Sequence, residues 1–149
     1  MKATFALGCF WHPDEIFSKL PGVTNVIVGY AGGSQENPTY DMVCSGKTGH
    51  VEAIEVFYDP EVISYEKLLD TFWSSHDPTQ TNGQGVDIGT QYKSVIFYHD
   101  DKQKLLAETS KFSQAKLHNK EIATQIIQTP KFYQAEEYHQ KYLLKKRNK

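Results

Sequence analysis

The order of strand-like and helix-like segments constrains the fold of this chain more than any single motif does. Apolar runs typical of β-strands lie at residues 3–7, 23–30, 51–58 and 94–98. Apolar residues at helical spacing follow the first run, starting near Trp11, and the third run, where Ser64 is a suitable N-cap. The resulting order, β-α-β-β-α-β, predicts an α+β fold, a ferredoxin-like two-layer α/β sandwich.

Further elements are expected in the second half of the chain. Another helix opens at Asp100 or Asp101, and residues 122–127 have the composition of an edge strand. Helical spacing then predicts an extra C-terminal helix beyond Pro130. The residues that indicate this helix are Ala135, Tyr138 and Tyr142, together with the four-apart pair of Glu137 and Lys141.

Two long stretches, residues 31–50 and 76–92, have no clear period and are rich in Gly, Asn, Asp and Gln. Long ordered loops in compact domains are usually functional. We therefore expect catalytic or binding residues in these two loops and at their borders.

The overall composition excludes several classes of protein. A chain of 149 residues fits one domain, residues 1–149, with a real core. Sixteen basic and eighteen acidic side chains leave a formal net charge of −2, which attracts neither nucleic acid nor an anionic membrane. The chain shows no run of transmembrane length and no signal-peptide pattern, so we expect a reducing cytoplasm, where its two cysteines stay thiols.

Cys9 lies where the first strand is expected to give way to the first helix, in Gly8-Cys9-Phe10-Trp11. Free backbone N–H groups and the positive end of a helix dipole stabilise a thiolate at such a junction, and the thiolate is the reactive form. Free cysteine is also among the most buried residue types and is commonly inert packing. Placement alone leaves both interpretations open.

Other motifs do not indicate a site. Gly46-Lys47-Thr48 is similar to the end of a phosphate loop, but a strand follows it instead of a helix. The six histidines are scattered, and the chain has neither an HExxH nor a CxxC motif. We therefore expect no bound nucleotide and no metal.

Glu52 is the most informative carboxyl group, because it falls on the same strand face as Ile54 and Val56. Desolvation there would disfavour the charged form and leave a proton donor near neutral pH. The alternative is that Glu52 starts its strand and faces water. The other candidates, each with a packing or surface alternative, are Tyr40, Asp87, Tyr92, Phe10 and Trp11.

Six stretches of the chain resemble, in order, motifs of the A-type peptide-methionine sulfoxide reductases. They are Gly8-Cys9-Phe10-Trp11, Asn37-Pro38-Thr39-Tyr40, Val43-Cys44-Ser45-Gly46, Thr48-Gly49-His50-Val51-Glu52-Ala53, Asp87-Ile88-Gly89-Thr90-Gln91-Tyr92-Lys93-Ser94 and Ala135-Glu136-Glu137-Tyr138-His139-Gln140. One such match would be weak evidence, whereas six in order over nearly the whole chain are specific. The resemblance implies reduction of methionine S-sulfoxide, free or in proteins.

The resemblance also assigns roles to the candidates. Cys9 matches the nucleophile that attacks the sulfoxide sulfur and becomes a sulfenic acid, and Glu52 matches the acid that protonates the oxygen. Three residues match the polar groups around that oxygen, and two match the walls that receive the substrate's methyl group. The polar groups are Tyr40, Tyr92 and Asp87, and the walls are Phe10 and Trp11.

Two departures from the family pattern matter. After the Trp this chain has His12-Pro13-Asp14-Glu15, where the family commonly has Gly and then an acidic residue. Many members carry resolving cysteines in a C-terminal tail, but no cysteine follows Cys44 here. We therefore expect an external thiol such as thioredoxin, glutaredoxin or glutathione to reduce the sulfenic acid without a cofactor, with Cys44 as a possible resolving residue. A monomer is expected.

Two rival functions stay open on the sequence. A cysteine peroxidase also needs an activated thiol and forms a sulfenic acid, but it needs no aromatic methyl pocket. A non-catalytic module that binds oxidised methionine would keep the pocket, and the missing tail cysteines favour it.

Overall fold

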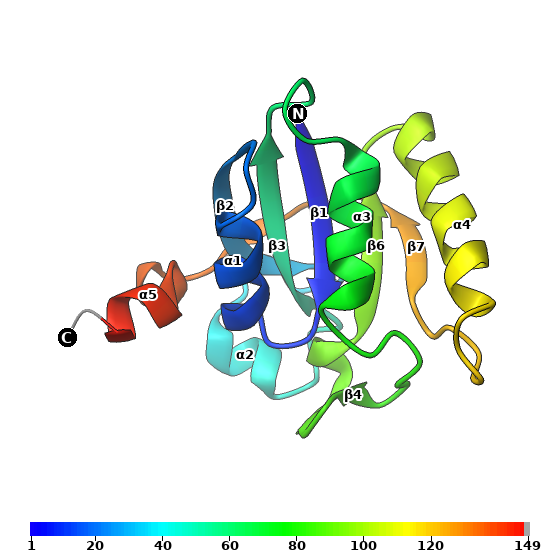
Figure 1. Ribbon diagram of the computed structural model, residues 1–149. Coiled ribbons are helices and arrows are strands. Elements are labelled where there is room, and N and C mark those ends of the chain that lie inside the picture. The colour runs from blue at the N-terminus through cyan, green and yellow to red at the C-terminus, as the bar shows by residue number, and fades with distance from the viewer. Residues whose placement is uncertain (148–149) are drawn as a thin grey trace.

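A computed structural model describes residues 1–147 as a mixed sheet with helices packed on it (Figure 1). The strands of the main sheet are β1 (Lys2–Leu7), β2 (Val23–Ala31), β3 (Val51–Tyr58), β6 (Ser94–Tyr98), β7 (Gln125–Gln128) and β8 (Tyr133–Gln134). The helices are α1 (Trp11–Ser18), α2 (Tyr40–Cys44), α3 (Tyr65–Ser74), α4 (Asp101–Ala115) and α5 (Tyr142–Arg147). A two-stranded hairpin, β4 (Gly83–Gln84) and β5 (Asp87–Ile88), and two 3₁₀ turns, η1 (Thr90–Tyr92) and η2 (Glu137–His139), complete it.

The six strands of the main sheet lie in the order β7-β6-β1-β3-β2-β8. β1 is antiparallel to both β3 and β6, and β2 is antiparallel to β3, whereas β7 runs parallel to β6. The four central strands and the helices α1 and α3 give the β-α-β-β-α-β arrangement of a ferredoxin-like sandwich. The predicted α+β fold class is confirmed.

The core lies between the sheet and the helices α1 and α3, which cover the same face in Figure 1. The Phe5 ring of β1 lies 5.6 Å from the Phe17 ring of α1 and 5.2 Å from the Phe72 ring of α3. All three side chains are fully buried. Burial stabilises the fold by about 1.5–3 kcal/mol for each such side chain, so these contacts fix α1 against the end of β1.

Two helices begin where the sequence indicates. The Ser64 hydroxyl accepts the backbone N–H of Lys67 at 3.1 Å, and the Asp100 carboxylate accepts that of Gln103 at 2.8 Å. Asp100 is therefore the N-cap of α4 and Asp101 its first residue. Each cap stabilises its helix by about 1 kcal/mol. The expected edge strand at residues 122–127 is confirmed as β7, shifted to Gln125–Gln128.

The extra C-terminal helix predicted beyond Pro130 is present as α5, but Ala135 and Tyr138, whose spacing indicated it, lie outside it. Residues 133–141 instead run along the open edge of β2, and helix α5 starts only at Tyr142. The Gln140 side chain bonds both the N–H and the carbonyl of Val28, at 3.0 Å each, which replaces the local bonds of a helix. Lys141 has φ +55°, which no helix allows.

The expected pairing of Glu137 with Lys141 is also wrong. The Lys141 ammonium lies 2.9 Å from the buried carboxylate of Asp14 in α1, and Glu137 lies 3.4 Å from Lys145. Tertiary contacts have replaced the local pair. Within residues 1–147, no helix is long and apolar enough to span a membrane.

Candidate active site

Strand β1 ends at the lower edge of the sheet in Figure 1, near α2 and β4. Cys9 is the second residue after this strand. Gly8 turns the chain there with φ +99°, and a Cβ at this position would lie 2.9 Å from the side chain of Gln84. The turn therefore requires glycine. It leaves Cys9 half-buried and free, directly before α1.

The thiolate expected at Cys9 is not favoured in the free protein. Burial raises the pKa of the Cys9 thiol to about 12, because desolvation outweighs the hydrogen bond from the backbone N–H of Trp11. The negative charges of Glu52 and Asp87 raise this pKa further. The start of the helix acts in the predicted direction, but it is too weak to offset burial, and Cys9 carries its proton at neutral pH.

Glu52 lies near the start of β3 and is only 1 % exposed, so the alternative that it faces water is wrong. Its Oε1 accepts the backbone N–H of Phe10, the residue after Cys9, at 3.2 Å. Its Oε2 is buried and has no partner among the described residues. Burial raises the pKa of Glu52 to about 7, against the Phe10 hydrogen bond and with the help of Asp87.

Phe10 and Trp11 form an aromatic wall beside the thiol. Phe10 is buried, with its ring 5.2 Å from the His139 ring, whereas Trp11 is half-buried. The indole of Trp11 stacks on Tyr142 of α5 at 3.8 Å, and its Nε1–H donates to Nδ1 of His139 at 3.0 Å. Aromatic faces held in this way can contact a small apolar group such as a methyl.

The two candidate phenols come from different elements. Tyr40 begins α2, and Tyr92 ends η1. Burial raises the pKa of both phenols, to about 12 for Tyr92, and the charges of Glu52 and Cys44 act in the same direction. Both therefore remain hydrogen-bond donors at any working pH. The Tyr40 hydroxyl also interacts with the side chain of Cys44, four residues along α2.

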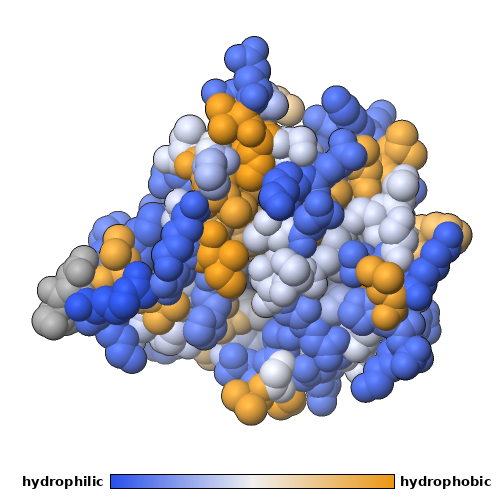
Figure 2. Space-filling view, in the orientation of Figure 1, coloured by the Kyte–Doolittle hydropathy of each residue, from blue (hydrophilic) through white to orange (hydrophobic). Residues whose placement is uncertain are grey.

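Asp87 and Cys44 are the exposed members of the group. The charge of Asp87 acts on Glu52, Cys9 and Tyr92, although Asp87 itself lies on the exposed hairpin. The neighbouring Val86 and Ile88 are 94 % and 58 % exposed, and apolar surface is visible at the lower edge of Figure 2. The hairpin thus combines a carboxylate with apolar side chains beside the thiol.

Comparisons with known proteins identify the family of this chain. The family model described as peptide methionine sulfoxide reductase matches residues 1–149. The chain belongs to this family. It is 52 % identical over 147 residues to the peptide methionine sulfoxide reductase MsrA of Methanosarcina acetivorans, covering 97 % of this chain and 78 % of that protein.

Solved structures of the family share the fold as well. The reduced form of Mxr1 from Saccharomyces cerevisiae superposes with a TM-score of 0.94 at 37 % identity, covering 100 % of this chain and 87 % of that one. Mxr1 in complex with Trx2 superposes with a TM-score of 0.68 at 28 % identity, covering 95 % of this chain and 84 % of the other.

Sequence reasoning missed three residues that contact members of this group in the reductase-family chain: Tyr30, Glu136 and His139. Tyr30 and His139 are fully buried, and both rings pack against Phe10. Glu136 binds Tyr30 and the start of α2. Only the stretch from Ala135 to Gln140 pointed to the last two, and it gave them no role.

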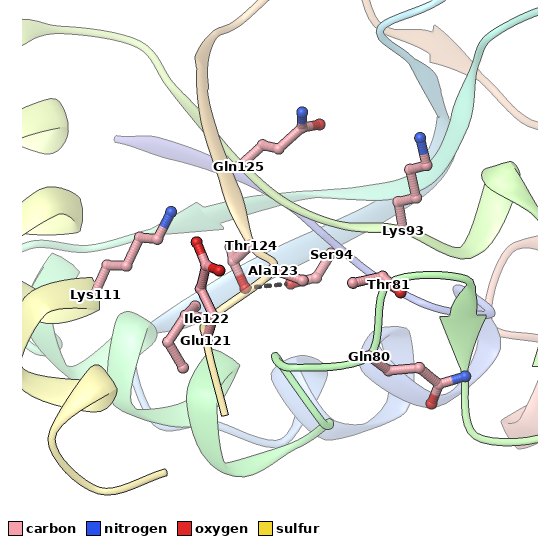
Figure 3. Close-up of a pocket in the computed structure, with 10 residues that line it drawn as sticks. All are labelled: Gln80, Thr81, Lys93, Ser94, Lys111, Glu121, Ile122, Ala123, Thr124 and Gln125. Atoms are coloured by element: carbon pink, nitrogen blue, oxygen red, sulfur yellow. Dashed lines mark hydrogen bonds between the residues drawn. The ribbon is translucent and has the colours of Figure 1, made fainter. Parts of the chain in front are cut away.

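A cavity of about 440 Å³ elsewhere in the molecule shares no residue with the Cys9 group (Figure 3). At its wall the Ser94 hydroxyl lies 2.7 Å from Thr124 Oγ1 and 2.7 Å from His76 Nε2. His76 Nδ1 donates to the carbonyl of Phe72 at 2.7 Å, and burial lowers the pKa of His76 to about 4. The hydroxyls and the imidazole therefore bond to one another, and the charged side chains of the lining are Lys93, Lys111 and Glu121.

The described part of the chain contains no group of three His, Cys, Asp or Glu side chains close enough to hold a metal ion.

Proposed function

We propose that this chain reduces methionine sulfoxide, free or within proteins, to methionine, with Cys9 as the nucleophile and Glu52 as the acid. The observation that carries this proposal is the carboxyl group of Glu52. One of its oxygens accepts the N–H next to Cys9, and the other is buried without a partner in residues 1–147. A carboxyl group with a pKa of about 7 is half protonated near neutral pH and can donate a proton.

The oxygen of the sulfoxide is the group that must be protonated. Glu52 donates its proton to that oxygen while the Cys9 sulfur attacks the sulfoxide sulfur, and the thiol proton returns to the Glu52 carboxylate. The Cys9 sulfur is then bonded to the substrate sulfur, which carries a hydroxyl group. Glu52 protonates this hydroxyl, the S–O bond breaks and water leaves; water then attacks the Cys9 sulfur, the S–S bond breaks and the thioether departs, while the proton returns to Glu52. In the net reaction the Cys9 thiol is oxidised by two electrons to a sulfenic acid, and the sulfoxide is reduced to a thioether.

The surrounding side chains suit the other parts of a methyl sulfoxide. The hydroxyls of Tyr40 and Tyr92 keep their protons and can donate to the oxygen, where charge develops in the transition state. Phe10 and Trp11 offer apolar faces to the methyl group. We assign Asp87 to the entrance, where a carboxylate can accept an N–H of the substrate's backbone.

A thiol is required to complete the cycle. Two external thiols would reduce the sulfenic acid to the thiol, with release of water and formation of a disulfide. The complex of Mxr1 with Trx2 supports thioredoxin as the donor, and glutaredoxin or glutathione are alternatives. The free Cys44 supports a second route, in which its thiol condenses with the sulfenic acid to a Cys9–Cys44 disulfide and water. Two free thiols fit a reducing cytoplasm.

Turnover of methionine sulfoxide with dithiothreitol tests the proposal. Wild-type protein should complete many turnovers, and Cys9→Ser should complete none while its circular dichroism spectrum stays unchanged. Undiminished turnover by Cys9→Ser would remove Cys9 from the mechanism. Mass spectrometry after one equivalent of substrate without reductant should show a gain of one oxygen on Cys9, or a disulfide if Cys44 resolves it.

The same assay separates the rival functions. A peroxidase would turn over hydrogen peroxide faster than methionine sulfoxide. A binding module would stop after at most one equivalent of substrate with every thiol tried. Either result would contradict the proposed function.

A further inference from the structure

The carboxylate of Glu136 joins two elements that carry groups of the proposed site. Its Oε1 accepts the hydroxyl proton of Tyr30 in β2 at 2.9 Å. Its Oε2 accepts the backbone N–H of Tyr40, the first residue of α2, at 3.0 Å. Glu136 lies 106 and 96 residues away from these two partners along the chain. One side chain therefore ties α2 to the sheet.

Glu136 keeps its charge in this position. Burial raises its pKa, but hydrogen bonds from the N–H of Tyr40, from its own N–H and from Tyr30 outweigh burial, and the pKa lies below the ordinary value. A charged carboxylate can accept both bonds at once. A neutral amide has one acceptor oxygen and no charge, so it can accept only one of these two bonds, and that bond is weaker than one to a carboxylate.

The position of Tyr40 depends on this bond. Helix α2 has only five residues, far fewer than a helix that is stable on its own. Its first N–H groups need partners: the Thr39 hydroxyl accepts the N–H of Met42 at 3.3 Å, and Glu136 accepts that of Tyr40. A negative charge at this end of the helix is also favourable.

The second hydrogen bond of Glu136, to Tyr30, holds a side chain that packs against Phe10. Tyr30 is fully buried, and its ring lies 5.8 Å from the ring of Phe10. In the sheet, Tyr30 is the register partner of Glu52 on β3. The Glu136 carboxylate thus bonds both Tyr30, which pairs with the proposed acid Glu52 in the sheet, and Tyr40, which carries a proposed oxygen-binding phenol.

The backbone around Glu136 is itself fixed. The N–H of Ala135 donates to the carbonyl of Val28 at 2.9 Å, and the Gln140 amide bonds the carbonyl of Ala135 at 3.0 Å. Tyr133 and Gln134 pair with β2. Glu136 is therefore held on a rigid edge of the sheet, as a group that orients another must be.

We propose that Glu136 is a positioning residue for the reduction of methionine sulfoxide, acting by fixing the start of α2 and with it the Tyr40 phenol. This role rests on the proposed function. Glu136 touches no reacting atom. Its effect on the rate should pass mainly through Tyr40, whose backbone N–H it accepts.

A double-mutant cycle tests this dependence. Glu136→Gln should lower kcat by about 10- to 100-fold with a smaller change in KM, because a misplaced donor weakens the transition state most. Tyr40→Phe should cost about 100-fold. The double variant should be no more than about three times slower than the slower single variant, because a phenol that is absent cannot be misplaced.

The neighbouring Glu137→Gln is the matched control. The Glu137 side chain is exposed, and its hydrogen-bond partner among the described residues is Lys145, so this variant should keep wild-type rates. Losses that multiply in the double variant, or an equal loss in Glu137→Gln, would overturn the role of Glu136 while leaving the proposed function intact. A wild-type protein without turnover would instead overturn both.

Amide hydrogen exchange gives a readout that does not depend on activity. In the wild type the Tyr40 amide should exchange slowly, and in Glu136→Ala it should exchange at least about ten times faster, because its acceptor is lost. Tyr30→Phe removes only the other bond of Glu136, so its Tyr40 amide should stay protected. This variant remains available if Glu136→Ala proves too unstable to study. An unprotected Tyr40 amide in the wild type would contradict the proposal.

Discussion

Two carboxyl groups of this site, Glu52 and Glu136, lie in environments that move their pKa values in opposite directions. Glu52 accepts one backbone N–H and leaves its second oxygen without a partner, and its pKa rises to about 7. Glu136 accepts hydrogen bonds on both oxygens, and its pKa falls. Burial alone would raise both values, so the number of donors decides which carboxyl keeps its proton. An acid and an anchor are made from the same side chain.

Glu52→Gln should have the largest effect of any change at these two carboxyls. The amide keeps the shape of the side chain and can still accept the Phe10 N–H, but it cannot donate a proton to the sulfoxide oxygen. We expect kcat to fall by about 10²- to 10⁴-fold. Single-turnover measurement of sulfenic acid formation reports this step directly.

Glu55→Gln is the control on the same strand. Burial raises the pKa of Glu55 too, but its carboxylate pairs with Lys2 at the far end of β1. It should turn over like the wild type. A Glu52→Gln variant with wild-type rates would show that another group protonates the oxygen.

The second effect is a fall of kcat/KM with increasing pH. The free protein holds both the Cys9 and the Glu52 protons below about pH 7, and only the Glu52 proton is lost between pH 7 and pH 9. Because Glu52 must donate, kcat/KM should fall about tenfold per pH unit above its pKa. Glu136 stays ionised throughout this range and adds no second step.

The pH profile of Glu52→Gln should be flat where that of the wild type falls. A wild-type rate that rises through pH 7 would show that the reactive state carries one proton fewer and that Glu52 does not start as the acid.

The sequence indicated one of these carboxyls and not the other, for a physical reason. Glu52 lies two residues before Ile54 in a strand of period two, so its buried face could be read locally. Both partners of Glu136 are about one hundred residues away, and no local pattern records such bonds. Helical spacing around Ala135 was in fact misleading, because contacts with β2 replaced the helix.

The same distinction explains the rest of the site and fold. Period and caps predicted the central strands, α1, α3 and α4, since these depend on neighbouring residues. Helix α2 was missed because five residues do not show a period. The high pKa of Cys9 was missed because desolvation depends on what covers the thiol, and the helix start that the sequence showed is the weaker influence.

The smallest expected effect is on the stability of the fold. At pH 8 Glu52→Gln should raise the stability, whereas Glu136→Gln should lower it. The folded protein binds the Glu52 proton more tightly than the unfolded chain, whose carboxyl has its ordinary pKa of 4.5. The wild type therefore loses up to about 3 kcal/mol of stability as the pH rises from 4.5 through 7. Glu52→Gln carries no charge to bury, so at pH 8 it should be more stable than the wild type by up to that amount and about equally stable at pH 4.

Glu136 has a lowered pKa, so its contribution is present above pH 4.5 and is lost only as the pH falls through its folded value. Glu136→Gln should therefore be less stable than the wild type at pH 8, by about 1–2 kcal/mol, because it leaves a donor without an acceptor. Urea unfolding of both variants at pH 8 measures whether Glu52→Gln gains stability and Glu136→Gln loses it. Two losses of similar size would mean that Glu52 is satisfied in the folded protein, and the contrast between an acid and an anchor would then rest on the reaction alone.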